Sequence, residues 1–217
     1  MTQPFIRNHQ YNFIKNLVEI LQRACRTVND LKIVESIRYD TLSKINELFP
    51  AATESQKQLL EAVSECKTTE DFQRYLRSLE PYMLEFSAIT EKQIKKLFPK
   101  NKKLKIPNLS AIDFRYVTYL SWIDIGTNKL FIVYELNGQF IGIEGRNNPT
   151  NKTGYCFLCN KSGEVSLFSA ISKSRPAHSL PDYYKAIGNY MCSNSHECNK
   201  NITDQTNIER FIQNVLG

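Results

Sequence analysis

The sequence predicts an α+β protein with two domains, an N-terminal four-helix bundle over residues 1–84 and a C-terminal α/β domain over residues 85–217. The first part repeats apolar residues at the three-and-four spacing of amphipathic helices. The second part is rich in Tyr, Phe, Val and Ile, as half-buried strands are, and it holds four of the six cysteines in two close pairs. A chain of 217 residues is long enough for two small hydrophobic cores.

Four amphipathic segments make up the expected bundle. Asp30 is a suitable N-cap for the second segment, and Thr53 followed by Gln56 has the form of a capping box at the start of the third. The expected helices cover residues 8–28, 30–48, 53–66 and 68–79. Because short polar connections join them, their apolar stripes are buried most simply against one another. Cys25 and Cys66 lie among these apolar residues and are expected in the core.

A lysine-rich segment follows the bundle, beginning with a short fifth helix at Thr90. Its lysines are Lys92, Lys95, Lys96, Lys100, Lys102, Lys103 and Lys105. One interpretation is a solvated connector that repels itself and stays extended. The other is a surface that meets nucleic acid or an acidic partner. The formal net charge of +6 and the pI near 8.9 favour such a partner without requiring one.

Strands of the second domain are expected at residues 114–123, 129–136 and 139–144. Between the last two, Asn137 and Gly138 supply the positive-φ pair of a tight hairpin. Trp122, the single tryptophan, is expected to pack under this sheet. A further short strand at residues 165–168 and a C-terminal helix over residues 203–216 complete the predicted domain.

The cysteines of the second domain have the spacing of a structural zinc site. Cys156 and Cys159 form a C-x-x-C pair, Cys192 and Cys198 form a second pair, and 32 residues separate the pairs. Four thiolates close a tetrahedron at about 2.3 Å from the metal. His196 lies between the last two cysteines and could replace one as a ligand. The alternatives are a redox C-x-x-C motif, disulfides, or unligated buried thiols.

Two further features favour zinc. The chain shows no basic-then-apolar leader and no apolar run near the roughly 20 residues that span a bilayer, so we expect a cytoplasmic protein. Thiols stay reduced in that compartment, which disfavours disulfides. The order of the cysteines and the expected elements is also that of a treble-clef zinc finger, in which two cysteines on a knuckle are followed by β structure and then by two cysteines that lead into a helix.

The sequence contains no motif typical of an enzyme of this size. It has no G-x-x-x-x-G-K-[ST] phosphate loop, no H-E-x-x-H helix and no G-x-S-x-G turn. Three histidines offer few candidates for general acid–base catalysis. A zinc ion held by four thiolates has no open position for an activated water. We therefore expect a binding protein rather than an enzyme.

Five sequence motifs resemble those of a known family. They are NHQYNFI at residues 8–14, RTVND at 26–30, KIP at 105–107, the knuckle CFLCNK at 156–161 with VSLF at 165–168, and YMC at 190–192 followed after five residues by CNK at 198–200. Together they resemble the FusB-type fusidic acid resistance proteins, also called elongation factor G-binding proteins, over essentially the whole chain.

This resemblance implies a function. Members of that family bind the C-terminal domains of elongation factor G and promote its departure from the ribosome when fusidic acid has trapped the GDP-bound factor there. They protect the target without altering the drug or hydrolysing nucleotide. The resemblance also implies one structural Zn²⁺, held by Cys156, Cys159, Cys192 and Cys198 in a treble-clef zinc finger. We expect a monomer with no membrane partner, for which contact with RNA is not required.

The resemblance further implies a factor-binding surface on the zinc-bearing domain. The residues in matching positions are Tyr155, Lys185, Tyr190 and Phe211. Tyr155 and Tyr190 lie close to zinc ligands, and aromatic side chains that are already ordered make efficient binding anchors. Phe211 is equally suited to fill the small core. The alternative function is that of a zinc-finger RNA-binding protein that uses the lysine-rich segment.

Overall fold

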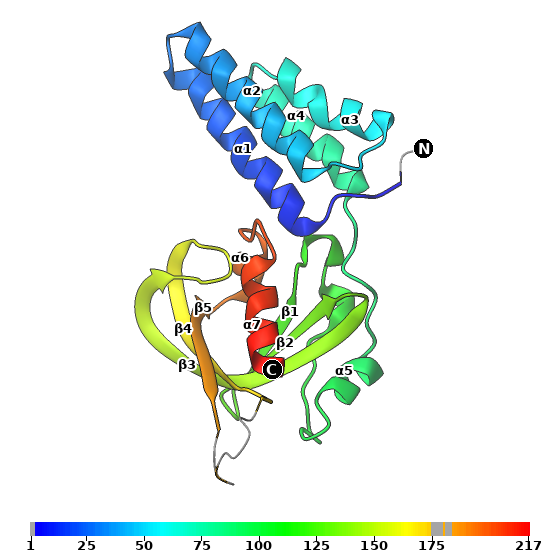
Figure 1. Cartoon of the computed structure of the whole chain (residues 1–217), viewed down its shortest axis with the longest axis vertical. Helices are drawn as coiled ribbons and strands as arrows, with labels where there is room; N and C mark the ends of the chain where they lie inside the picture. The colour runs from blue at the N-terminus through cyan, green and yellow to red at the C-terminus, as the bar shows by residue number, and fades with distance from the viewer. Residues whose placement is uncertain (1–2, 175–179, 181–183) are drawn as a thin grey trace. The chain divides into compact units, whose positions relative to one another are not determined.

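The computed structural model describes residues 3–174, 180 and 184–217 (Figure 1). The chain divides into two units, which we call unit 1 (Met1–Leu84) and unit 2 (Glu85–Gly217). Unit 1 is helical and unit 2 is built on an antiparallel sheet, which confirms the predicted α+β fold class. No helix in the described ranges is long and apolar enough to cross a membrane.

Unit 1 contains the four predicted helices. They are α1 (Asn8–Thr27), α2 (Leu31–Leu48), α3 (Glu54–Glu61) and α4 (Thr69–Leu79). The expected caps are present, since the Asp30 side chain accepts a hydrogen bond from the Lys32 backbone N–H at 2.9 Å and Thr53 with Gln56 forms a capping box. The predicted end of the third helix is wrong, because the chain tightens into a 3-10 turn, η1 (Ala62–Glu65), before Cys66.

The apolar faces of these helices form the core of unit 1. Its fully buried residues include Ile14, Leu21, Ile45, Leu60 and Leu79. The hydroxyl of Tyr75 donates to the Leu60 carbonyl at 2.9 Å and ties α4 to α3. Cys66 is buried, whereas Cys25 is half-buried and lies 3.8 Å from an Arg38 guanidinium nitrogen. The expected core position therefore holds for Cys66 only.

Unit 2 is built on five antiparallel strands in the order β1-β2-β3-β4-β5. The strands are β1 (Leu120–Asp124), β2 (Lys129–Leu136), β3 (Gln139–Tyr155), β4 (Ser162–Ile171) and β5 (Ala186–Cys192). The predicted hairpin turn joins β2 to β3, with φ of 51° at Asn137 and 76° at Gly138. Each strand pairs with the next along the chain, which brings the β3–β4 connection that carries Cys156 and Cys159 beside the end of β5 at Cys192.

The strands differ from the sequence prediction in four places, the simplest being β4, which was expected at residues 165–168 and covers Ser162–Ile171. Residues 114–116 form a 3-10 turn, η4, because the Asp113 side chain accepts the Arg115 backbone N–H at 3.1 Å, and β1 begins only at Leu120. Strand β3 does not end at Glu144 but continues to Tyr155 through polar residues whose backbone pairs with β4. Strand β5 was not predicted as a separate strand.

Helices cover both faces of this sheet. Leu130 and Ile132 of β2 lie in one core cluster with residues of α7 (Thr206–Leu216), and Phe131 and Val133 lie in a second cluster with Ile94 of α5 (Glu91–Leu97). Successive strand residues point to opposite faces. Helices α7 and α5 therefore lie on opposite sides of β2, as Figure 1 shows.

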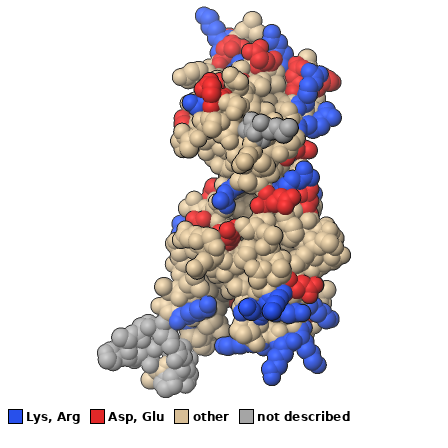
Figure 2. Space-filling model, turned by 90° about the vertical axis from the view of Figure 1, so that its right-hand side faces the viewer, with Lys and Arg blue, Asp and Glu red and all other residues tan. Residues whose placement is uncertain are grey.

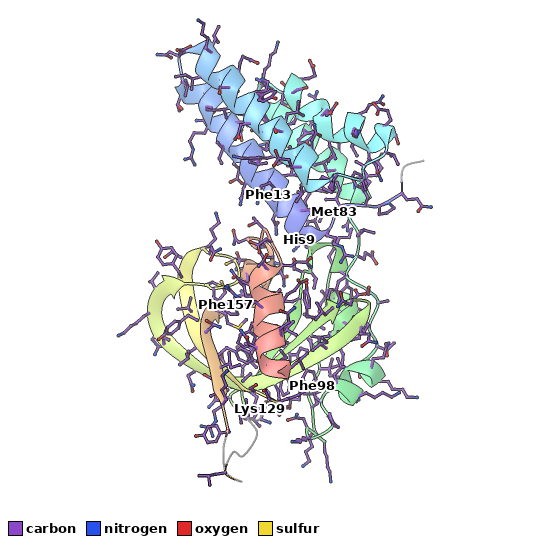
Figure 3. The ribbon with its side chains drawn as sticks, viewed as in Figure 1. His9, Phe13, Met83, Phe98, Lys129 and Phe157 are labelled. Atoms are coloured by element: carbon purple, nitrogen blue, oxygen red, sulfur yellow. The ribbon has the colours of Figure 1, made fainter. Side chains whose placement is uncertain are left out.

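The lysine-rich segment is folded onto the second cluster. The ring of Phe98, which is labelled in Figure 3, meets that of Phe131 edge-on with the ring centroids 5.0 Å apart, and Leu104 and Ile106 pack against the same cluster. The ring of Trp122 stacks on Phe131 at 5.4 Å. The interpretation of this segment as an extended connector is therefore wrong, because apolar residues spaced between the lysines anchor it.

Candidate metal centre

The four predicted ligand residues meet in one cluster. The Sγ atoms of Cys156, Cys159, Cys192 and Cys198 all lie within 4.8 Å of one another. The Cys156–Cys198 pair is separated by 3.7 Å and the Cys159–Cys192 pair by 3.6 Å. A tetrahedron with zinc–sulfur bonds of about 2.3 Å has sulfur–sulfur edges of about 3.8 Å. The arrangement of the thiols therefore fits a tetrahedral zinc ion.

The first two cysteines lie on a knuckle between β3 and β4. The Cys156 backbone N–H donates to the Lys161 carbonyl at 3.1 Å, and the Asn160 N–H donates to the Cys156 carbonyl at 2.9 Å. Asn160 closes the knuckle with φ of 53°, a left-handed conformation that asparagine adopts more readily than most residues. The Leu158 N–H points to the Cys156 sulfur at 3.4 Å. The backbone thus holds this pair in a position to share one ion.

The second pair spans a strand end and a short helix. Cys192 ends β5, and Cys198 lies in α6 (Ser195–Asn199), whose N-cap Asn194 accepts the His196 N–H at 2.9 Å. The sequence prediction placed these cysteines before a helix at residue 203. The structure corrects this in two ways, because α6 itself carries Cys198 and α7 begins at Thr206.

Asn199 fixes α6 to the chain before β1. Its side-chain oxygen accepts the backbone N–H groups of Thr118 at 2.8 Å and Tyr119 at 3.3 Å. Its amide nitrogen donates to the Tyr119 carbonyl at 3.0 Å and to the Ser195 carbonyl at 3.1 Å. One buried side chain therefore sets the position of the helix that carries Cys198.

Thiols alone make up the donor set. His196, the alternative ligand, is exposed on α6, and within the described ranges no His, Asp or Glu joins the cluster. The pKa of Cys156 is lowered, mainly by a hydrogen bond with the Cys159 thiol. The pKa of Cys198 is raised, mainly by a hydrogen bond with the Cys156 thiol. Four thiolates this close repel one another unless a cation lies between them. The site therefore fits a closed, structural zinc ion, which would hold the two chain segments together.

Two predicted partner-binding residues lie exposed beside this centre. Tyr155 is 74% exposed at the end of β3, and Tyr190 is 51% exposed on β5. The Phe157 N–H donates to the Tyr190 carbonyl at 2.8 Å, which joins the two strand ends. Both tyrosines are close in sequence to a ligand, so their backbones are held where the metal holds the chain.

The other two predicted residues occupy different environments. Lys185 is exposed five residues before Tyr190, or about 16 Å along an extended chain. Phe211 of α7 is only 3% exposed, and its ring lies 5.5 Å from that of Phe157 (Figure 3) and 5.6 Å from that of Phe168. The structure therefore places Phe211 in the core beneath the knuckle.

Among the exposed apolar side chains of unit 2 that sequence reasoning did not single out are Ile171 and Tyr184. Ile171 at the end of β4 is 64% exposed, and Tyr184 is 70% exposed. Ile171 pairs with Ala186 at the start of β5, so this pair of residues extends the exposed apolar surface along β5 away from the metal centre. If β5 had been recognised in the sequence as a strand, its antiparallel pairing with β4 would have placed Ile171 opposite Ala186.

Comparison with known proteins gave three findings. A family model described as "Elongation factor G-binding protein, N-terminal" matches residues 5–87, and one described as "FBP C-terminal treble-clef zinc-finger" matches residues 96–214. The solved structure "Structure of the fusidic acid resistance protein FusC" is similar with a TM-score of 0.81 and 30% sequence identity, covering 97% of each chain. A search of curated protein sequences gave no match. The treble-clef match and the thiol geometry together confirm the predicted structural zinc ion.

Proposed function

This chain belongs to the FusB-type family of elongation factor G-binding, fusidic acid resistance proteins, and on that premise we propose that it binds elongation factor G and promotes its release from the ribosome. The observation that carries the proposal is the similarity to FusC, which extends over 97% of both chains and therefore includes both units. The protein would thus protect the target of fusidic acid.

The surface beside the metal centre supports the proposed binding. Tyr155 and Tyr190 are exposed, yet their backbones are fixed by the knuckle and by β5. Binding a partner therefore orders little additional chain, which is the condition under which aromatic side chains become binding hot spots. Lys185 is the proposed basic member of this surface, and Phe211 would act from the core by holding Phe157 in place.

Release of a trapped factor requires differential binding. A ligand with equal affinity for the ribosome-locked and released conformations of the factor shifts neither population. We therefore propose that this surface fits the released or releasing conformation better. A hundredfold preference corresponds to about 2.7 kcal/mol, which two aromatic hot spots can supply.

The metal centre supports target protection rather than chemical alteration of the drug. Cys156, Cys159, Cys192 and Cys198 would hold the zinc ion and leave no position for a water or a substrate. The family to which the chain belongs is one of factor-binding resistance proteins rather than a known enzyme class. We propose that the protein does not change fusidic acid chemically.

The test is calorimetric titration of zinc-loaded protein with purified elongation factor G. We expect a 1:1 complex that Tyr155→Ala or Tyr190→Ala weakens by about 2 kcal/mol or more, roughly a thirtyfold rise in Kd. The matched control is Tyr39→Ala, because Tyr39 is 76% exposed on α2 and lies outside unit 2. Absence of a complex would refute the proposed partner, and unchanged affinity in both unit 2 variants would refute the proposed surface.

A further inference from the structure

The positive charge of the chain is concentrated in one segment of unit 2. Residues 91–105 contain seven lysines and one acidic residue, Glu91. Leaving these out of the 28 basic and 22 acidic residues of the chain gives 21 of each, so the formal net charge of +6 lies entirely in this segment. Figure 2 faces the side on which α5 lies in Figure 1, and lysine and arginine side chains gather at its lower right.

The fold presents these lysines outward. We call the seven exposed side chains of Lys92, Lys95, Lys96, Lys100, Lys102, Lys103 and Lys105 the lysine patch. Ile94 and Phe98 are buried between them, and Leu97, Leu104 and Ile106 pack against the same core. Consecutive turns also fix the backbone, since the Asn101 N–H donates to the Phe98 carbonyl at 3.0 Å and the Leu104 N–H donates to the Asn101 carbonyl at 3.1 Å. The patch is therefore an ordered surface.

Few acidic groups neutralise the patch. Lys95 lies 3.7 Å from Glu91, and both side chains are well exposed, so this pair contributes little. The carboxylate of Glu144, near Asn101, is paired with Lys129 at 3.1 Å. Among the described residues, the other six lysines of the patch have no ion-pair partner within 4.0 Å. Their charge is available to a partner.

The chemistry of the patch distinguishes between two kinds of acidic partner. Protein interfaces depend on buried aromatic and apolar anchors and are depleted in lysine. The large apolar side chains of residues 91–105 are turned into the core, and none of them is exposed. Contacts with a phosphate backbone, in contrast, need only positive charge, and they need no aromatic groups unless bases are read or stacked. The patch fits phosphates better than a protein.

We propose that the lysine patch is a binding surface for the phosphate backbone of RNA, without base specificity. RNA binding by the lysine patch is an activity additional to the proposed function, because the patch shares no residue with the surface of Tyr155 and Tyr190. It would let the protein dock on ribosomal RNA while the other surface contacts a protein.

Fluorescence anisotropy with a labelled 20-base-pair RNA duplex of arbitrary sequence tests this inference. The test variant is Lys96→Gln, Lys100→Gln, Lys102→Gln and Lys103→Gln combined, and the control carries the same change at the exposed Lys32, Lys57, Lys67 and Lys152. We expect the logarithm of the association constant of the parent to fall with the logarithm of KCl concentration with a slope of about −4. The test variant should lose most of this slope and bind at least about tenfold more weakly at 100 mM KCl, because each removed phosphate contact lowers the slope by about one.

The control should stay within about twofold of the parent, and zinc content and circular dichroism should be unchanged in all three proteins, because the replaced side chains are exposed. Three results would overturn the inference. They are a parent that does not bind the duplex at 50 mM KCl, a control that loses as much affinity as the test variant, and a test variant that binds the duplex within about twofold of the parent. If that variant instead loses affinity for elongation factor G in calorimetry, the patch meets an acidic protein surface.

Discussion

The side chain of Asn199 should hold the metal centre to the rest of unit 2. It is 5% exposed and makes four hydrogen bonds, three of them to Thr118 and Tyr119, which are some 80 residues distant in sequence. Asn199→Ala would leave two buried backbone N–H groups without this acceptor. A net contribution of about 1 kcal/mol for each bond predicts a loss of roughly 3–4 kcal/mol.

Urea unfolding followed by fluorescence measures this loss. Trp122 is the single tryptophan and lies in β1, so its emission reports on unit 2 alone, while the circular dichroism signal comes mainly from unit 1, which contains the longest helices, α1 and α2. Asn207→Ala provides a graded control, because the Asn207 side chain donates one part-buried hydrogen bond, to the Phe157 carbonyl at 2.7 Å, and its other bond, accepted from Arg210 at 2.8 Å, is exposed and contributes little. We expect about 1 kcal/mol for this control. A chelator that changes colour on binding zinc should also remove the ion faster from Asn199→Ala.

The comparison between the two asparagines shows whether side-chain hydrogen bonds or the ion alone hold α6 in place. A loss at Asn199 no larger than that at Asn207, with an unchanged rate of zinc release, would show that α6 is held by the ion alone. The expected large loss would show that the protein preorganises the site before the metal binds. Measurements at fixed free zinc are required, because bound metal adds to apparent stability.

Two further outcomes are expected. Cys159→Ser should leave less than one zinc per chain by elemental analysis and unfold unit 2, because structural zinc supplies folding free energy. The circular dichroism signal of the unit 1 helices should remain. A fully zinc-loaded, folded variant would contradict the ligand assignment. Phe211→Ala should destabilise unit 2 by about 3–5 kcal/mol, because it opens a cavity beside Phe157 and Phe168. Phe211→Leu should fold and bind elongation factor G within about twofold of the parent. A folded Phe211→Leu protein with tenfold weaker binding would indicate that Phe211 contacts the factor directly.

Local sequence signals predicted the helical unit well. Helix starts depend on side chains within three residues of each other, so Asp30 and the pair Thr53–Gln56 could be read directly from the sequence. The metal ligands could also be read, because zinc restricts both the residue type and the spacing.

The parts of unit 2 that depend on distant pairing could not be predicted in this way. The second half of β3 is polar, and its strand conformation comes from hydrogen bonds to β4 rather than from apolar alternation. The short helix α6 is stabilised by Asn199 contacts to residues about 80 positions earlier, which no local pattern shows. The position of Phe211 follows from the packing of α7 on the sheet, so the sequence left its role open between core and surface.

Release of elongation factor G from ribosomes in the presence of fusidic acid is the decisive experiment for the proposed function. Ribosomes that carry the factor with GDP and fusidic acid are incubated with zinc-loaded protein and sedimented, and the supernatant is assayed for released factor. The drug is then recovered, and its molecular mass is measured by mass spectrometry. We expect the released fraction to rise with protein concentration, Tyr155→Ala to release less factor than Tyr39→Ala, and fusidic acid to keep its mass. A factor that stays in the pellet at saturating protein would contradict the proposed release, and a drug of altered mass would contradict protection without chemical change of the drug.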